Sequence, residues 1–203
     1  MQPQTQRRPK RFRNAPREWH HHHLLLVLSM FGSAVLFLFV IIAFFATREP
    51  STPIHVPKYF AYSTVLLLLS SYPVYRLSAS FEKEQGRQII KDLLVAVFAG
   101  FLFTLLQVAG WAEMNEAGKG LDNRSASFLV ILSGLHLLHV VAITVISTVV
   151  MYKVTAKLFS PITKLVYYTN PYQRLVLQML THAWVFLHVV WVVIYLTFVT
   201  VAG

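Results

Sequence analysis

Five long apolar runs constrain the fold of this chain more than any other feature of its sequence. They cover residues 24–47, 59–75, 93–112, 125–152 and 175–201, and none of them contains Asp, Glu, Lys or Arg. A helix crosses a hydrocarbon core of about 30 Å with roughly 17 to 25 apolar residues. The sequence therefore predicts an all-α protein, a polytopic bundle of five transmembrane helices.

The composition excludes several classes of function. The chain is 56% hydrophobic with a mean hydropathy of +0.56, outside the usual range of soluble domains. It has no cysteine, which excludes iron–sulfur clusters held by thiolates, covalently attached c-type haem, cysteine-bound copper or zinc, and disulfides. The net charge is +10, but basic residues beside apolar runs are typical of the cytoplasmic side of a membrane, so we do not expect a nucleic-acid partner.

The distribution of positive charge predicts the orientation. With the N-terminus inside, fourteen of the eighteen Lys and Arg residues fall on the cytoplasmic side, as the positive-inside rule requires. We therefore expect a cytoplasmic N-terminus and a C-terminus on the opposite side of the membrane. Residues 1–19 are polar and basic and are predicted to be a disordered tail, and residues 20–203 form the predicted membrane domain.

The connections between the runs are short. The outer connection with Gly118 and Gly120 is predicted to be a turn. The inner connection, residues 154–173, is the longest, and Pro161 and Pro171 within it are predicted to break helices. No room is left for a domain outside the membrane.

Four histidines lie within the predicted spans. His136 and His139 are three residues apart and share a helix face, and the last run adds His182 and His188. Polar side chains at membrane depth are candidates for function. Because His139 and His182 fall at similar depth, a bis-histidine haem between their helices is conceivable, but we favour hydrogen bonds across helix interfaces.

The last run also places polar and aromatic residues on one face. Thr181, Trp184, His188 and Trp191 follow helical spacing. The stripe could line a ligand site, and we favour the alternative that it packs against a neighbouring helix.

A run of four histidines, residues 20–23, lies at the start of the first span. Metal capture, a fragment of an affinity tag and a titratable anchor among the lipid headgroups are all compatible with it. Successive helical residues point in different directions, so we favour an interfacial role without a dedicated metal.

The string from Ser133 to Val140 resembles the T-G-x-H-x-x-H-V signature of cytochrome c oxidase subunit III. The stretch from Gln107 to Trp111 is similar to that family's Q-x-x-E-[YW] element one helix earlier. The stretch from Trp184 to Trp191 is similar to its W-H-x-x-D-x-x-W element in the last helix. The resemblance covers roughly residues 24–203 and implies the short five-helix bacterial form. Such a subunit would lie in the bacterial inner membrane with its C-terminus in the periplasm.

The resemblance carries over a set of fold and interface residues and also shows departures. Gly110 stands where the family often has Glu, Val185 stands where it has His, and Met30 follows Ser29 where it has a Ser-Glu pair. The residues carried over are Gln107, Trp111, Ser133, Gly134, His136, His139, Trp184 and Trp191.

The function implied is that of a non-catalytic core subunit of a bacterial haem–copper cytochrome c oxidase, without a catalytic residue or metal of its own. By the resemblance, subunit I holds the haems and one copper, and subunit II receives electrons from cytochrome c. Oxygen is then reduced to water with proton pumping. This chain would pack against subunit I within a complex that also contains subunits II and IV, support proton uptake and oxygen access, and bind structural phospholipids. A larger supercomplex with a quinol-oxidising complex is a further expected assembly.

Two other classes of function remain open at this point. One is a b-type haem-binding membrane anchor that uses His136, His139, His182 and His188. The other is a small transporter, which the lack of charged residues in all five runs disfavours.

Overall fold

The chain folds into long helices joined by short connections. The computed structural model describes residues 15–48, 56–116 and 124–202, without the side chains of 15–22, 161 and 162. Most of the predicted tail, the side chains of His20 to His22, and Gly118 and Gly120 lie outside the described residues. The helices are α1 (Ala15–Thr47), α2 (Lys58–Glu82), α3 (Gly86–Glu116), α4 (Arg124–Leu158), α5 (Pro161–Thr169) and α6 (Pro171–Ala202).

Each of the five apolar runs lies inside one long helix, and the described residues contain no strand. α1 begins at Ala15, inside the segment predicted to be a tail. The inner connection also contains a short helix that was not predicted, α5. Pro161 and Pro171 are the first residues of α5 and α6. A proline at this position removes no helical hydrogen bond, so both prolines start a helix as well as ending the segment before it.

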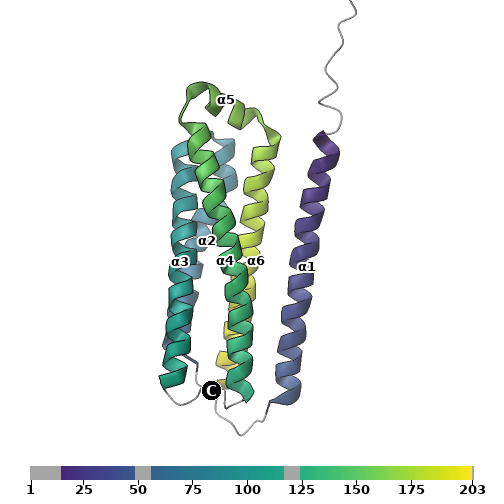
Figure 1. Cartoon of the computed structure of the whole chain (residues 1–203), viewed down its shortest axis with the longest axis vertical. Coiled ribbons are helices and arrows are strands. Elements are labelled where there is room, and N and C mark those ends of the chain that lie inside the picture. The colour runs from purple at the N-terminus through teal and green to yellow at the C-terminus, as the bar shows by residue number, and fades with distance from the viewer. Residues whose placement is uncertain (1–14, 49–55, 117–123, 203) are drawn as a thin grey trace, which may run out of the picture.

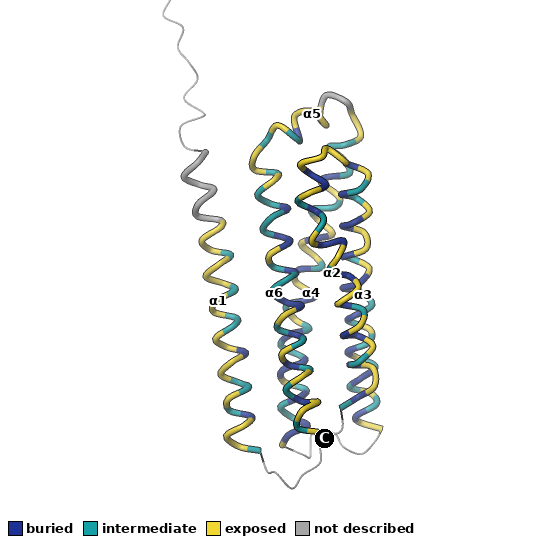
Figure 2. The backbone as a smooth tube through the Cα atoms, turned by 180° about the vertical axis from the view of Figure 1, so that it is seen from behind, coloured by how far each residue is buried: buried dark blue, intermediate teal, exposed yellow. Residues whose placement is uncertain are grey.

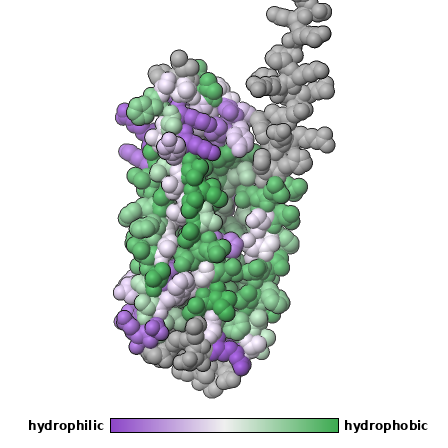
Figure 3. Space-filling view, in the orientation of Figure 1, coloured by the Kyte–Doolittle hydropathy of each residue, from purple (hydrophilic) through white to green (hydrophobic). Residues whose placement is uncertain are grey.

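The structure has the character of an α-helical membrane bundle. Within the described part of the chain, α1 from His23, α3, α4 and α6 are each long and apolar enough to cross a membrane. Figure 3 shows a belt of apolar side chains between two hydrophilic ends. α2, the second predicted span, is not among the four by its hydropathy.

Four of the helices form the body of the bundle, and α1 stands beside it (Figure 1). α2 packs against α3 and α6, and α4 packs against the same two helices, which closes a ring of four. Among the described residues, α1 packs mainly against α6 and less against α4. α5 lies across the end where α4 and α6 meet. Figure 2 shows that α1 is exposed along most of its surface.

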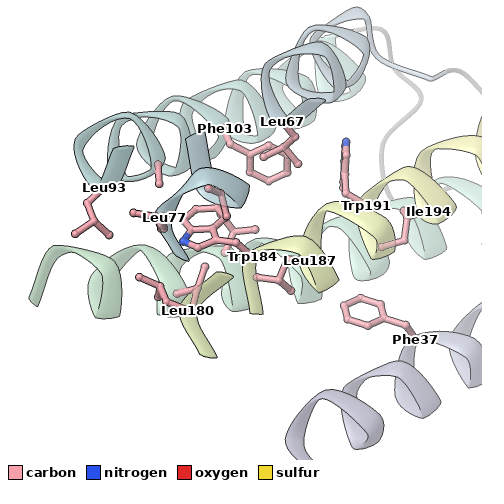
Figure 4. Close-up of a cluster of buried hydrophobic side chains, with 14 of the residues drawn as sticks. Phe37, Leu67, Leu77, Leu93, Phe103, Leu180, Trp184, Leu187, Trp191 and Ile194 are labelled. Carbon is pink, nitrogen blue, oxygen red and sulfur yellow. The ribbon is translucent and has the colours of Figure 1, made fainter. Parts of the chain in front are cut away.

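Aliphatic and aromatic side chains pack together between the helices (Figure 4). Trp184, Trp191 and Phe103 are almost completely buried, as is Phe60. Phe60 packs edge-on against Trp191 with ring centroids 5.5 Å apart. It also fills the space beside Gly110, where a Cβ atom would lie 2.4 Å from Cε1 of the phenyl ring. Gly110 therefore lets α2 and α3 approach closely.

Candidate functional site

His136 lies at the centre of the buried polar groups. It is fully buried on α4, and its Nε2 lies 3.0 Å from the carbonyl oxygen of Leu187 on α6. Because a carbonyl only accepts, Nε2 carries the hydrogen and donates it. The ring lies between Phe103 and Trp191, with centroid distances of 5.4 and 5.1 Å. Its Nδ1 has no hydrogen-bond partner among the described residues.

His139 joins α4 to α1. Its Nδ1 lies 2.7 Å from the carbonyl oxygen of Leu135 and donates to it. The other nitrogen, Nε2, therefore accepts from the hydroxyl of Ser33 on α1, 3.2 Å away. The ring also contacts Phe37 of α1, with centroids 5.6 Å apart. His139 thus provides one polar link between α1 and α4. Arg124 provides another at the end of α1, where it donates to the carbonyl oxygen of Thr47 at 3.1 Å.

His188 joins α6 to α2. Its Nδ1 lies 3.2 Å from the hydroxyl of Ser71, and its Nε2 lies 3.4 Å from that of Ser70. Both hydroxyls also lie near the carbonyl oxygen of Leu67 within α2, at 2.8 and 3.0 Å. A neutral imidazole donates from one nitrogen only, so one serine accepts from the ring and donates to Leu67, and the other donates to the ring. His188 is therefore held by two side chains of the neighbouring helix.

Three tryptophan indoles make the same kind of contact. Trp111 donates from Nε1 to the hydroxyl of Ser133, joining α3 to α4 at 2.9 Å. Trp184 donates to Ser147, joining α6 to α4 at 2.9 Å, and Trp191 donates to Thr64 of α2, also at 2.9 Å. Each bond crosses a different pair of helices.

The remaining residues of the resemblance lie in the same region. Gln107 of α3 is fully buried and donates from Nε2 to the hydroxyl of Ser63 on α2, 3.1 Å away. Its Oε1 has no hydrogen-bond partner among the described residues. A Cβ atom at Gly134 would be in ordinary van der Waals contact with the Trp111 ring, 3.7 Å away.

His182 does not join this group. It lies on the exposed side of α6, whereas His136 and His188 are buried. The structure therefore does not bring His139 and His182 together as a pair of ligands between helices. No cluster of three or more His, Asp or Glu side chains suited to a metal occurs in the described residues.

An ion pair between an exposed arginine and a buried carboxylate, at one end of the α2–α3 hairpin, was not predicted from the sequence. Arg76 donates to both carboxylate oxygens of Asp92, at 2.6 and 3.2 Å, and Gln88 adds a bond of 2.8 Å. Asp92 is only 1% exposed. The two residues are equally distant in sequence from Glu84, which closes the hairpin with a φ of 53°. Opposite charges placed symmetrically about a turn were the signal that could have revealed this pair.

A groove of about 400 Å³ lies between α4 and α6, beside α5. Seven aliphatic residues, five of them valine, form much of its wall, and Lys153, Lys157, Tyr167, Tyr172 and Gln173 also line it. The ammonium of Lys157 lies 5.9 Å from the centre of the Tyr167 ring. Burial raises the pKa of Tyr167 above its ordinary value, so its hydroxyl stays protonated. An apolar wall with two ammonium groups matches the acyl chains and phosphate of a phospholipid.

The geometry thus places most candidate residues in contacts between helices and leaves His182 exposed. Neither the protein-family models nor the curated proteins compared with this chain give a match.

Proposed function

We propose that this chain is a non-catalytic core subunit of a bacterial haem–copper cytochrome c oxidase, as its resemblance to subunit III implies. The observation that carries the proposal is that the residues of the resemblance bond one helix to another. Trp111 bonds Ser133, His136 bonds α6, and Trp184 and Trp191 bond α4 and α2. Such bonds stabilise membrane bundles, so their use here suits a scaffold.

In this proposal α2 is the fifth span. It has 25 residues, about 37 Å at 1.5 Å per residue, and it packs along α3 and α6, which are both apolar enough to span. Its low hydropathy comes partly from Ser63, Thr64 and Ser70, which are buried against protein. The positive-inside rule then gives a cytoplasmic N-terminus and a periplasmic C-terminus.

The chemistry of oxygen reduction belongs to the partners. Subunit I would hold the haems and one copper, and subunit II would receive electrons from cytochrome c. This chain would pack against subunit I, in contact with the rest of a complex that includes subunit IV. It would support proton uptake and oxygen access from outside the catalytic centre.

Phospholipid binding is the part of this role that the groove beside α5 supports. Lys153 and Lys157 line the groove together with Val149 and Val150. A phosphate held by the lysines would place its acyl chains along the valines, because basic residues at the cytoplasmic end of a helix attract anionic headgroups.

The substitution of the family's Glu by Gly110 limits what this chain can do. Phe60 occupies the space that a side chain at position 110 would need. A proton or lipid function that depends on that carboxylate is therefore not carried by this position. Asp92 is the one buried carboxylate among the described residues, and it is bonded to Arg76.

Purification of the tagged full-length chain from its native membrane, in a mild detergent, tests the proposal. We expect subunits I and II of a haem–copper oxidase to co-purify in equal amounts, with cytochrome c oxidase activity. A chain that purifies without haem–copper polypeptides would contradict the proposal.

A further inference from the structure

α1 carries a regular stripe of less exposed side chains along one face. Buried or half-exposed positions recur at alternating steps of four and three residues, which is the spacing of a helix that packs lengthwise against another. We call these six residues the α1 contact stripe: Leu26, Met30, Ser33, Phe37, Val40 and Phe44.

Only the C-terminal part of the α1 contact stripe, from Ser33 onward, meets the bundle. The ring of Phe44 lies 5.8 Å from that of Phe128 on α4 and 4.9 Å from that of Phe198 on α6, measured between centroids. Among the described side chains that pack against the core, α1 contributes none before Phe37. The first two members of the stripe therefore lie outside the contact.

The groove beside α5 continues the surface of α4 that α1 occupies. His139 of α4 contacts α1, and Ile146, seven residues later on the same helix face, lines the groove. Ile146 is 52% exposed. No side chain of α1 lines the groove among the residues that the structure describes, so this part of the surface is uncovered.

The existing contacts give the register in which α1 would cover the groove. α1 and α4 run antiparallel (Figure 1), and Phe44 meets Phe128 near one end. Ser33, eleven residues earlier, meets His139, which lies eleven residues later on α4. Seven more residues along each helix, the same register places the first member of the α1 contact stripe opposite Ile146.

A flexible point separates the two parts of α1. Gly32 directly precedes Ser33, where the contact with α4 ends, and Gly/Ser pairs are sites at which helices bend. Nothing lies within 4 Å of a Cβ atom added at Gly32, so no neighbour holds the backbone there. Helices in lipid associate without a hydrophobic driving force, so a small free energy separates an open groove from a covered one.

We propose that the N-terminal part of α1, residues 23–31, is a lid that bends at Gly32 and closes over the groove between α4 and α6, with Leu26 against Ile146. The structure shows the lid open. A phospholipid in the groove would occupy the same valines, so lid closure and lipid binding exclude each other. The inference goes beyond the proposed function, because it concerns a movement within this chain and rests on the contacts of α1.

Cross-linking of cysteine pairs tests the lid in the full-length chain in its native membrane, because the chain has no cysteine of its own. A short bifunctional thiol reagent would be applied to Leu26→Cys/Ile146→Cys. Ser33→Cys/His139→Cys is the positive control, since these side chains already touch. Leu25→Cys/Ile146→Cys is the matched negative control, because Leu25 lies off the stripe and is 61% exposed. We expect a cross-link within the chain in the first two pairs and none in the third.

A third substitution tests the hinge. Gly32→Ala added to the Leu26→Cys/Ile146→Cys pair should slow cross-linking by about fivefold, the factor that corresponds to the difference of about 1 kcal/mol in helix propensity between glycine and alanine. The same substitution should leave the Ser33→Cys/His139→Cys cross-link unchanged. An unchanged rate in the first pair would overturn the hinge at Gly32.

Three results would overturn the lid itself. A cross-link in the positive control but not between positions 26 and 146 would show that lipid, rather than α1, covers the groove. Equal yields from positions 25 and 26 would show that α1 has no preferred face toward the groove. A cross-link between two copies would assign the groove to a second chain. Co-purification of haem–copper polypeptides is measured separately, so failure of the proposed function is distinguishable from failure of this inference.

Discussion

α1 and α2 show opposite relations between hydropathy and burial. An 18-residue apolar stretch of α1 has a mean hydropathy of 2.8, yet only 11% of its residues are buried. Phe37 and Phe44 are the buried side chains among the described residues of α1. α2 is not apolar enough to count as a span, yet ten of its residues are buried between α3 and α6.

The contrast teaches that hydropathy in a membrane helix reports what the helix faces. α1 turns most of its surface outward, so nearly every position must suit lipid. α2 turns one side to protein, where serine and threonine hydroxyls find partners such as Trp191 and His188. A less apolar helix can therefore be the better anchored of the two.

We expect the largest difference in the labelling of single cysteines at the two ends of α2, because this experiment shows whether α2 crosses the membrane. Lys58→Cys should react with an impermeant maleimide on intact cells, and Lys83→Cys should react only after permeabilisation. Labelling of both from the same side would contradict a spanning α2.

Overpacking the α2–α3 contact should give the largest loss of stability. Gly110→Ala places a methyl group 2.4 Å from a buried phenyl carbon of Phe60, and we expect a loss of about 2–3 kcal/mol in unfolding free energy. Gly32→Ala in α1 is the matched control, since nothing lies within 4 Å of its added Cβ. Thermal unfolding in detergent should show no loss of stability for Gly32→Ala. Equal losses in the two variants would contradict the tighter packing of α2 against α3.

Removing the buried charge of the α2–α3 hairpin should have the next largest effect. Asp92→Asn leaves Arg76 without its carboxylate partner, so the Tm should fall by several degrees. Glu82→Gln removes an ion pair with Arg174 in which both side chains are exposed. We expect this variant to change the Tm little. A similar small change in both variants would show that burial does not strengthen the first pair.

Removal of one hydroxyl from α2 should cost more stability than removal of one hydroxyl from α1. Thr64→Val leaves the buried Trp191 indole without an acceptor, and we expect a loss of about 1–2 kcal/mol. Ser33→Ala removes the polar link between α1 and His139, which is half-buried, and should reduce the unfolding free energy by about 0.6 kcal/mol. Chemical unfolding in mixed micelles measures both, and a larger loss at Ser33 would reverse the order.

The sequence predicted where the helices lie along the chain better than it predicted which helices pack against one another. Apolar runs located all five long helices because lipid imposes one requirement on every exposed position. α5 was missed because Pro161 and Pro171 were treated only as breakers, although proline at the first helical position also starts helices.

The site was predictable only in part, for a similar reason. Spacing placed Trp184, His188 and Trp191 on one face, and the structure places all three in helix contacts. Spacing could not show that His182 is exposed, because this depends on which sides of α6 other helices cover. The pairing of Arg76 with Asp92 depends in the same way on the register of the α2–α3 hairpin.

The visible spectrum of the purified chain, separated from its partners, tests the central claim most directly. The claim is that His136, His139 and His188 hold helices together and that the chain binds no redox centre. We predict no stoichiometric haem band in the isolated chain. A stoichiometric b-type band that is lost in His139→Ala or His182→Ala would contradict the scaffold account and establish a haem-binding anchor.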